Sequence, residues 1–253
     1  MSLPKAKPSL TSQWKYWGAG FNVLPCSGPV NLEQLIIDTT KGISDNPRLF
    51  VMTVTWLFEH HEIVDLEQLA RLADKLRGRD SACLGLILET ANEFIGTDVF
   101  GQVVAVCQPW DRPEPLCNVD RKLPGMARLV EKWASPLSRK WGLWIEAIDE
   151  LKHDAMRPAS WIAQINPTFL LRSLLKGDVR SKVITALAEQ GLSDVSETDL
   201  TRQAGCTRRA MHMALENLQA AGLIVRKRQG RSYAISLCRP CSQQIHGTML
   251  LPG

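Results

Sequence analysis

Residues 200–224 read LTRQAGCTRRAMHMALENLQAAGLI, and this stretch decides the fold of the C-terminal part of the chain. Gly205 and Cys206 predict a tight turn, because glycine adopts the backbone conformations that a sharp reversal requires. Thr207 is suited to cap the helix that follows this turn. The apolar residues of that helix recur every three or four positions, at Ala210, Ala214, Leu215 and Leu218. The stretch therefore predicts two helices joined by a short turn, the second of which ends at Gly222.

The sequence before this stretch predicts one more helix, and it also contains the start of the first of the two helices joined by the turn. Asp178 is suited to cap a helix over 179–189, whose core-facing residues are Val183, Ile184 and Leu187. Either Ser196 or Thr198 is suited to cap a short helix over 197–204, where acidic residues favour the positive helix end.

The sequence after this stretch predicts a β-hairpin. Residues 223–225 are β-prone and lead into the basic run 226–228. Residues 229–231, Gln-Gly-Arg, are typical of a turn. Residues 232–237 alternate in polarity as a returning strand does, so the tip of the hairpin is rich in arginine.

In this order, the features resemble the winged helix domains of bacterial transcription regulators, in the style of the MarR and ArsR groups. The residues that carry the resemblance are 200–209 and 215–224, and the resemblance covers about a quarter of the chain. It implies a winged helix-turn-helix with a recognition helix at 207–221 and a basic wing at 224–237. It also implies sequence-specific binding of double-stranded DNA and transcriptional regulation.

Two groups of side chains are candidates for DNA contact. A recognition helix enters the major groove, where the residues of its first turns reach base edges. At that end of the helix stand Thr207, Arg208, Arg209 and His212. Cations of a wing hold phosphates or enter the minor groove, which positions the protein without specifying sequence. The wing cations are Arg226, Lys227, Arg228 and Arg231.

The charge is distributed unevenly along the chain. From residue 200 to the end there are eight basic residues against one acid, Glu216, a net charge of +7 that leaves −3 for the rest of the +4 chain. A basic segment on a mildly acidic body suits a polyanionic partner, because neutralised phosphates release their condensed counterions.

The fold class that we expect is mostly α, with a small β-hairpin wing near the C-terminus. Residues 1–11 are expected to be a disordered lead-in, and 12–175 a helical domain with an effector or dimerisation role. Residues 176–238 then form the winged helix and 239–253 a tail. Within the helical domain, helical patterns cover 49–60, 66–76, 82–95, 126–133, 137–151 and 159–174, with a break at Pro167; 99–107 is ambiguous and 108–124 is a loop.

Four tryptophans of the helical domain stand at spacings that would bring several onto neighbouring helix faces. They are Trp133, Trp141, Trp144 and Trp161. Large aromatic side chains most often fill a core or a subunit interface. The alternative is a pocket for a small-molecule effector lined by these rings.

Cys238, Cys241 and His246 could form part of a zinc site, but a structural zinc needs four ligands and these are three. Cys206 or Cys26 would have to supply the fourth. A redox-sensing pair of Cys238 and Cys241, or two ordinary cysteines, are the alternatives. No cofactor is therefore expected.

The composition excludes some classes of protein. There is no apolar run of about 18 residues, so we expect no membrane span. Seven scattered cysteines, an odd number, fit a reducing cytoplasm better than a disulfide framework. No phosphate-binding loop, nucleophile elbow or HExxH motif occurs, and we expect no enzymatic activity.

A transcriptional regulator that binds DNA as a homodimer is the function that the sequence favours, because two-fold pairing doubles the number of base pairs that are read. Two alternatives remain. A replication or plasmid-maintenance initiator would use the same fold on repeated sites, and a winged-helix adaptor would use it to bind protein.

Overall fold

The computed structural model describes residues 8–123, 125–175, 178–190, 194–229 and 232–238. The chain is mostly helical, with a small three-stranded antiparallel sheet towards the C-terminus. Its packing divides it into two units, residues 1–25 with 32–157 and residues 26–31 with 158–253. The change from the first unit to the second after residue 157 comes earlier in the chain than the predicted domain boundary, which lies after residue 175. Over the described ranges, no helix has both the length and the apolar composition to cross a membrane.

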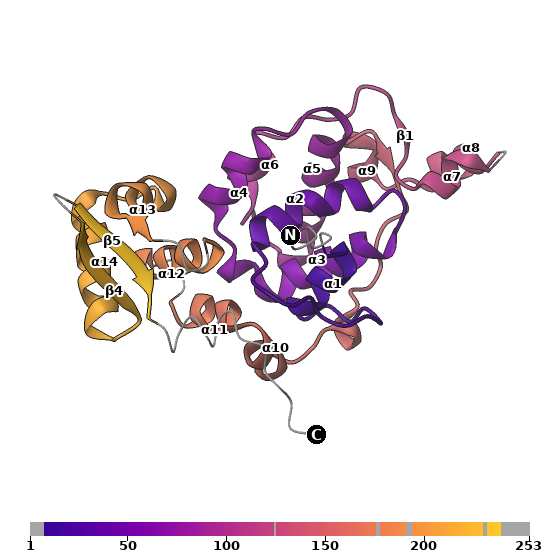
Figure 1. The fold of residues 1–253 in the computed structure, drawn as a ribbon. Coiled ribbons are helices and arrows are strands. Elements are labelled where there is room, and N and C mark those ends of the chain that lie inside the picture. The colour runs from indigo at the N-terminus through magenta and orange to yellow at the C-terminus, as the bar shows by residue number, and fades with distance from the viewer. Residues whose placement is uncertain (1–7, 124, 176–177, 191–193, 230–231, 239–253) are drawn as a thin grey trace, which may run out of the picture. The chain divides into compact units, whose positions relative to one another are not determined.

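The first unit is a helical body in which α5 packs against α2, α3, α6 and α9 (Figure 1). Two short parallel strands and two 3-10 turns complete it. Its elements are α1 (Leu10–Tyr16), α2 (Leu32–Gly42), α3 (Arg48–His60), η1 (His61–Ile63), α4 (Leu66–Ala73), α5 (Gly78–Ile95), α6 (Gly101–Val104), β1 (Glu114–Pro115), α7 (Asn118–Lys122), α8 (Met126–Trp133), α9 (Pro136–Lys140), β2 (Leu143–Trp144) and η2 (His153–Ala155).

Tryptophans from α1, its C-terminal cap and α3 meet in the core of this unit. Trp14, Trp17 and Trp56 are fully buried, and the ring centre of Trp56 lies 5.7 Å from that of Trp14 and 5.8 Å from that of Trp17. The indole N–H groups of Trp56 and Trp14 have acceptors, since Trp56 Nε1 donates to the Trp17 carbonyl at 2.6 Å and Trp14 Nε1 to Thr39 Oγ1 at 2.8 Å. Burying such large rings contributes strongly to stability, and the satisfied N–H groups remove its main cost.

The tryptophans that the sequence analysis grouped together do not share one environment. Trp133 is 58% exposed at the end of α8, whereas Trp141 is buried against α5. Trp161 belongs to the second unit. The interpretation as core residues is therefore confirmed for Trp141 and wrong for Trp133.

Several helices of the first unit match their predicted ranges, and two segments do not. The helix over 126–133 is confirmed, and Gly96 ends α5 in a left-handed conformation with a φ of 76°. The predicted loop over 108–124 instead contains β1 and α7. The predicted helix over 137–151 ends at Lys140, because the residues that follow pair with β1: the Glu114 N–H donates to the Gly142 carbonyl at 3.2 Å.

In the second unit, the helices α12, α13 and α14 pack against the antiparallel sheet. Its elements are α10 (Ala159–Ile165), α11 (Pro167–Leu174), α12 (Val179–Glu189), β3 (Val195–Ser196), α13 (Glu197–Ala204), α14 (Arg208–Ala220), β4 (Ile224–Gln229) and β5 (Ser232–Leu237). The break at Pro167 is confirmed, and Asn166 caps α11 by accepting from the Phe169 N–H at 3.1 Å. The strand order is β3-β5-β4, so the short strand that precedes α13 extends the hairpin β4–β5.

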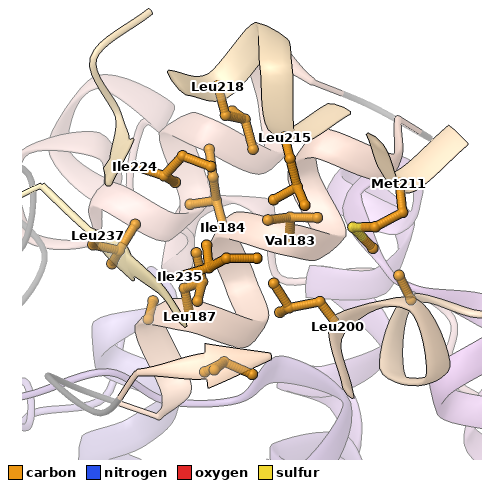
Figure 2. Packing of buried hydrophobic residues seen from close by; sticks show 13 residues of the cluster. Val183, Ile184, Leu187, Leu200, Met211, Leu215, Leu218, Ile224, Ile235 and Leu237 are labelled. Atoms are coloured by element: carbon orange, nitrogen blue, oxygen red, sulfur yellow. The ribbon is translucent and has the colours of Figure 1, made fainter. Parts of the chain in front are cut away.

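The core of this unit fixes which face of α14 points inwards. Side chains of α12 project towards those of α13, α14 and the hairpin (Figure 2). The residues labelled there are at most 7% exposed and comprise Val183, Ile184, Leu187, Leu200, Met211, Leu215, Leu218, Ile224, Ile235 and Leu237. Each aliphatic side chain of this kind contributes roughly 1.5–3 kcal/mol relative to an exposed one. Because α14 is held by Met211, Leu215 and Leu218, its opposite face is presented to solvent.

Candidate nucleic-acid interface

The turn between α13 and α14 is defined by caps at both helix ends. Ser196 Oγ accepts from the Asp199 N–H at 3.1 Å and so begins α13. Gly205 ends it with a φ of 61°, a left-handed conformation that glycine adopts without strain. Thr207 Oγ1 accepts from the Ala210 N–H at 3.2 Å and begins α14. The predicted turn and caps are confirmed, with Ser196 rather than Thr198 as the cap of α13.

Arg208 and Arg209 occupy the first turn of α14, and both are exposed. That turn contains no acidic residue, and neither guanidinium has a hydrogen-bond or ion-pair partner among the described residues. The first turn of a helix carries unpaired N–H groups and a partial positive charge, so a cation there costs about 0.3–1 kcal/mol. Two arginines at this position therefore concentrate positive charge at the exposed end of the helix.

The solvent-facing side of α14 continues from these arginines with polar residues and one exposed methionine. His212 lies one turn further along and points its Nε2 at Glu216 Oε1, 3.1 Å away, which is an ion pair only when the imidazole is protonated. Met213 is 55% exposed. Glu216 thus stands about two turns from Arg208 and leaves the charge of the first turn uncompensated.

The hairpin presents some but not all of its predicted cations. Lys227 and Arg228 are exposed on β4, opposite Ala234 and Tyr233 of β5. Arg231 lies outside the described residues. The hairpin was predicted from the alternation of residues 232–237, and both strands are confirmed.

Arg226 is directed into the unit rather than towards solvent. Its side chain is 11% exposed, its Nη2 lies 3.3 Å from Glu197 Oε2, and its guanidinium stacks 4.9 Å from the centre of the Tyr233 ring. The sequence analysis placed Arg226 among the wing cations that hold phosphate, and the structure removes it from that group. The missed signal is the period of two along the strand, which puts Arg226 on the same face as the buried Ile224.

The zinc site that the tail suggested is not assembled by the described part of the chain. Cys238 is half-buried, as are Cys206 and Cys26. Cys241 and His246 lie outside the described residues. Elsewhere in the described ranges, no three histidine, cysteine or acidic side chains gather in a way that could hold a metal ion.

Of the predicted contact residues that the structure describes, the exposed cations thus stand at two places in the second unit, Arg208 and Arg209 at the start of α14 and Lys227 and Arg228 on β4. The contacts that sequence reasoning missed are structural ones: Glu197 and Tyr233 hold Arg226, and Lys182 Nζ donates to the Ala204 carbonyl at the end of α13, 3.2 Å away. Comparison of the chain with protein-family models, curated proteins and solved structures found no match.

Proposed function

We propose that this chain is a sequence-specific DNA-binding protein and that its second unit is a winged helix-turn-helix whose helix α14 enters the major groove. The observation that carries the proposal is the pair Arg208 and Arg209, exposed side by side in the first turn of α14. An α-helix fits the major groove, and its N-terminal residues are the ones that reach base edges.

The electrostatics of α14 support an anionic partner. Arginine at the positive end of a helix is locally unfavourable, and the turn holds no acid to offset it. Residues that break a local rule in this way are typical of functional positions. A phosphate or the acceptor edge of a guanine would be favoured there both by the helix end and by the guanidinium groups.

The two groups of cations have different roles in this proposal. Arg208 or Arg209 pairs with guanine through two hydrogen bonds, which contributes on the order of 1–3 kcal/mol of discrimination. Lys227 and Arg228 contact phosphates and position the domain. Arg226 supports the hairpin from within the unit and is left out of the contact set.

Transcriptional regulation as a homodimer is the biological role that we propose for this activity. One recognition helix reads few base pairs, so a two-fold dimer on two half-sites would be needed to select an operator. An initiator of replication would bind tandem repeats with the same domain. A protein adaptor would bind DNA weakly or not at all.

The test is a footprint of the full chain on fragments of the native genome, followed by a titration of the affinity for the bound site with salt. We expect protection of discrete paired half-sites and a linear fall of log K with log salt concentration. Protection of tandem repeats at an origin would favour an initiator. Absence of DNA binding at 50 mM salt would disprove the proposal, and light scattering of the complex would test dimerisation.

A further inference from the structure

A cavity of about 210 Å³ opens on the first unit, between α3, α5, α9 and the segment after β2. Its inner wall is apolar: Phe50 and Leu86 are almost completely buried, and Phe94 of α5 stands half-buried beside them. Ile145 and Ile148 close the opposite side. All of these residues belong to one unit, so the cavity depends on no contact between units.

The volume of the cavity sets the size of the molecule that it can hold. An apolar cavity of roughly 150 Å³ accommodates benzene. A cavity of about 210 Å³ therefore has room for one aromatic ring, and a short chain on that ring can extend towards the opening.

Two carboxylates at the rim of the cavity determine the charge of the ligand. Glu93 and Glu146 line it and are exposed, and neither has an ion pair among the described residues. Glu89, one turn before Glu93 on α5, differs: its carboxylate accepts from Lys140 Nζ at 2.5 Å and from Trp141 Nε1 at 2.6 Å. Glu93 and Glu146 therefore differ from Glu89 in that no cation of the described residues pairs with their carboxylates.

The hydroxyl groups in the lining are already engaged with the backbone. Thr90 Oγ1 donates to the Leu86 carbonyl at 2.7 Å, and Ser135 Oγ accepts from the Ser138 N–H at 3.1 Å. The carboxylates of Glu93 and Glu146 are thus the polar groups best placed to meet a ligand, and they attract cations.

We propose that this cavity binds a small organic cation of the arylalkylammonium class. The ring of the ligand would contact Phe50 and Leu86, and its ammonium group would lie at the rim beside Glu93 and Glu146. Phe94 also lines the cavity, and an aromatic ring near an ammonium group adds cation–π attraction. This site is independent of the proposed DNA-binding activity, and its test involves no DNA.

The test uses calorimetric titration of the full chain with phenethylamine, and with 2-phenylethanol as a neutral ligand of nearly the same shape. We expect phenethylamine to bind at least about 10-fold more tightly, because charge-assisted contacts with carboxylates are the stronger ones. Equal affinities for the two ligands, or no binding of phenethylamine, would overturn the proposal.

Variants locate the site. Glu93→Gln and Glu146→Gln should each weaken phenethylamine binding about 5-fold and leave 2-phenylethanol binding unchanged. Asp149→Asn is the matched control, since it removes the same charge three residues from Glu146 and outside the lining. Ala147→Phe, at an exposed position of the lining, should abolish binding of both ligands by filling the opening. If Asp149→Asn weakens the amine as much as Glu146→Gln does, the affinity is general surface attraction and the site is disproved.

Discussion

Arg226 and Glu197 form an ion pair that joins strand β4 to the first residue of helix α13, with Nη2 and Oε2 3.3 Å apart. The arginine side chain is 11% exposed and the glutamate side chain 31%, and the guanidinium also lies over the Tyr233 ring. The pair therefore connects the hairpin to the helix that precedes α14. A cation held in this way contributes to the stability of the unit rather than to a charged surface.

We predict that Arg226→Ala lowers the stability of the second unit by about 1–2 kcal/mol, because Glu197 loses its partner while it remains partly buried. Urea unfolding followed by circular dichroism measures this change. Lys227→Ala is the control, since it removes a charge from the next, exposed position of the same strand and should change stability by less than about 0.5 kcal/mol. Equal unfolding midpoints for the two variants would contradict the structural role of Arg226.

Local signals in the sequence were sufficient to place the helix ends of the second unit. Asp178, Ser196 and Thr207 cap their helices through hydrogen bonds to N–H groups two or three residues away, so their role is visible within a few residues of sequence. The hairpin is predictable for the same reason, because alternation and turn residues are local as well.

Features that depend on distant residues were not predictable in this way. The helix expected over 137–151 stops at Lys140 because residues 143–144 pair with residues 114–115, a parallel contact that no local pattern indicates. Trp14 and Trp56 meet across more than forty residues, and Glu197 meets Arg226 across 29. Of the candidate site, the position of Arg208 and Arg209 was therefore predictable. The face on which Arg226 lies follows from the period of two along the strand, but its pairing with Glu197 does not follow from any local pattern.

The buried thiols of the first unit should resist alkylation in the folded protein. Burial raises the pKa of Cys83 and of Cys107 to about 12 and that of Cys117 to about 11. A thiol with a pKa of 12 is ionised to about one part in ten thousand at pH 8, and the thiolate is the reactive form. A rise in pH therefore increases the reactivity of these cysteines, and neutral pH suppresses it.

The measurement is a short exposure to iodoacetamide at pH 8, with the labelled peptides identified by mass spectrometry. We expect the half-buried Cys206 to be labelled and Cys83, Cys107 and Cys117 to be protected until urea unfolds the chain. Labelling of Cys83 in the folded protein at the rate of Cys206 would show that the packing around it is wrong.

Gly85 is required by the position of Trp141. A Cβ atom at Gly85 would overlap the six-membered ring of that indole, which is 2% exposed and held by its hydrogen bond to Glu89. We predict that Gly85→Ala destabilises the first unit by about 1–2 kcal/mol, although alanine favours a helix by about 1 kcal/mol over glycine. In a Trp141→Phe background the same substitution should become neutral or stabilising. Urea unfolding of the four proteins of this cycle measures the coupling, and additive effects would exclude the contact.

Lys227 should contribute to DNA affinity without contributing to sequence preference. We predict that Lys227→Ala weakens binding to specific and random duplexes by the same factor and lowers the slope of log K against log salt concentration by about one. Arg226→Ala, measured below its unfolding transition, should leave the slope unchanged, because its guanidinium already neutralises Glu197. A reduced slope for Arg226→Ala alone would reverse the two assignments.

Replacing Arg208 or Arg209 with an acid should raise the stability of the second unit and at the same time impair DNA recognition. We predict that Arg208→Glu or Arg209→Glu stabilises the second unit by a few tenths of a kcal/mol, because an acid replaces a cation at the positive end of α14. The same substitutions should abolish preference for the footprinted site, and Arg208→Gln and Arg209→Gln show whether loss of the cation alone is enough. Thermal unfolding and competition of specific against random duplex measure the two effects on the same samples.

Arg202→Gln is the control on α13. It removes an exposed cation that is paired with Asp199, so we expect any reduction in affinity to be equal for both duplexes. If Arg208→Glu and Arg209→Glu are stabilised and still discriminate between the two duplexes, the unfavourable charge at the start of α14 has another purpose, and base reading must be assigned to other residues.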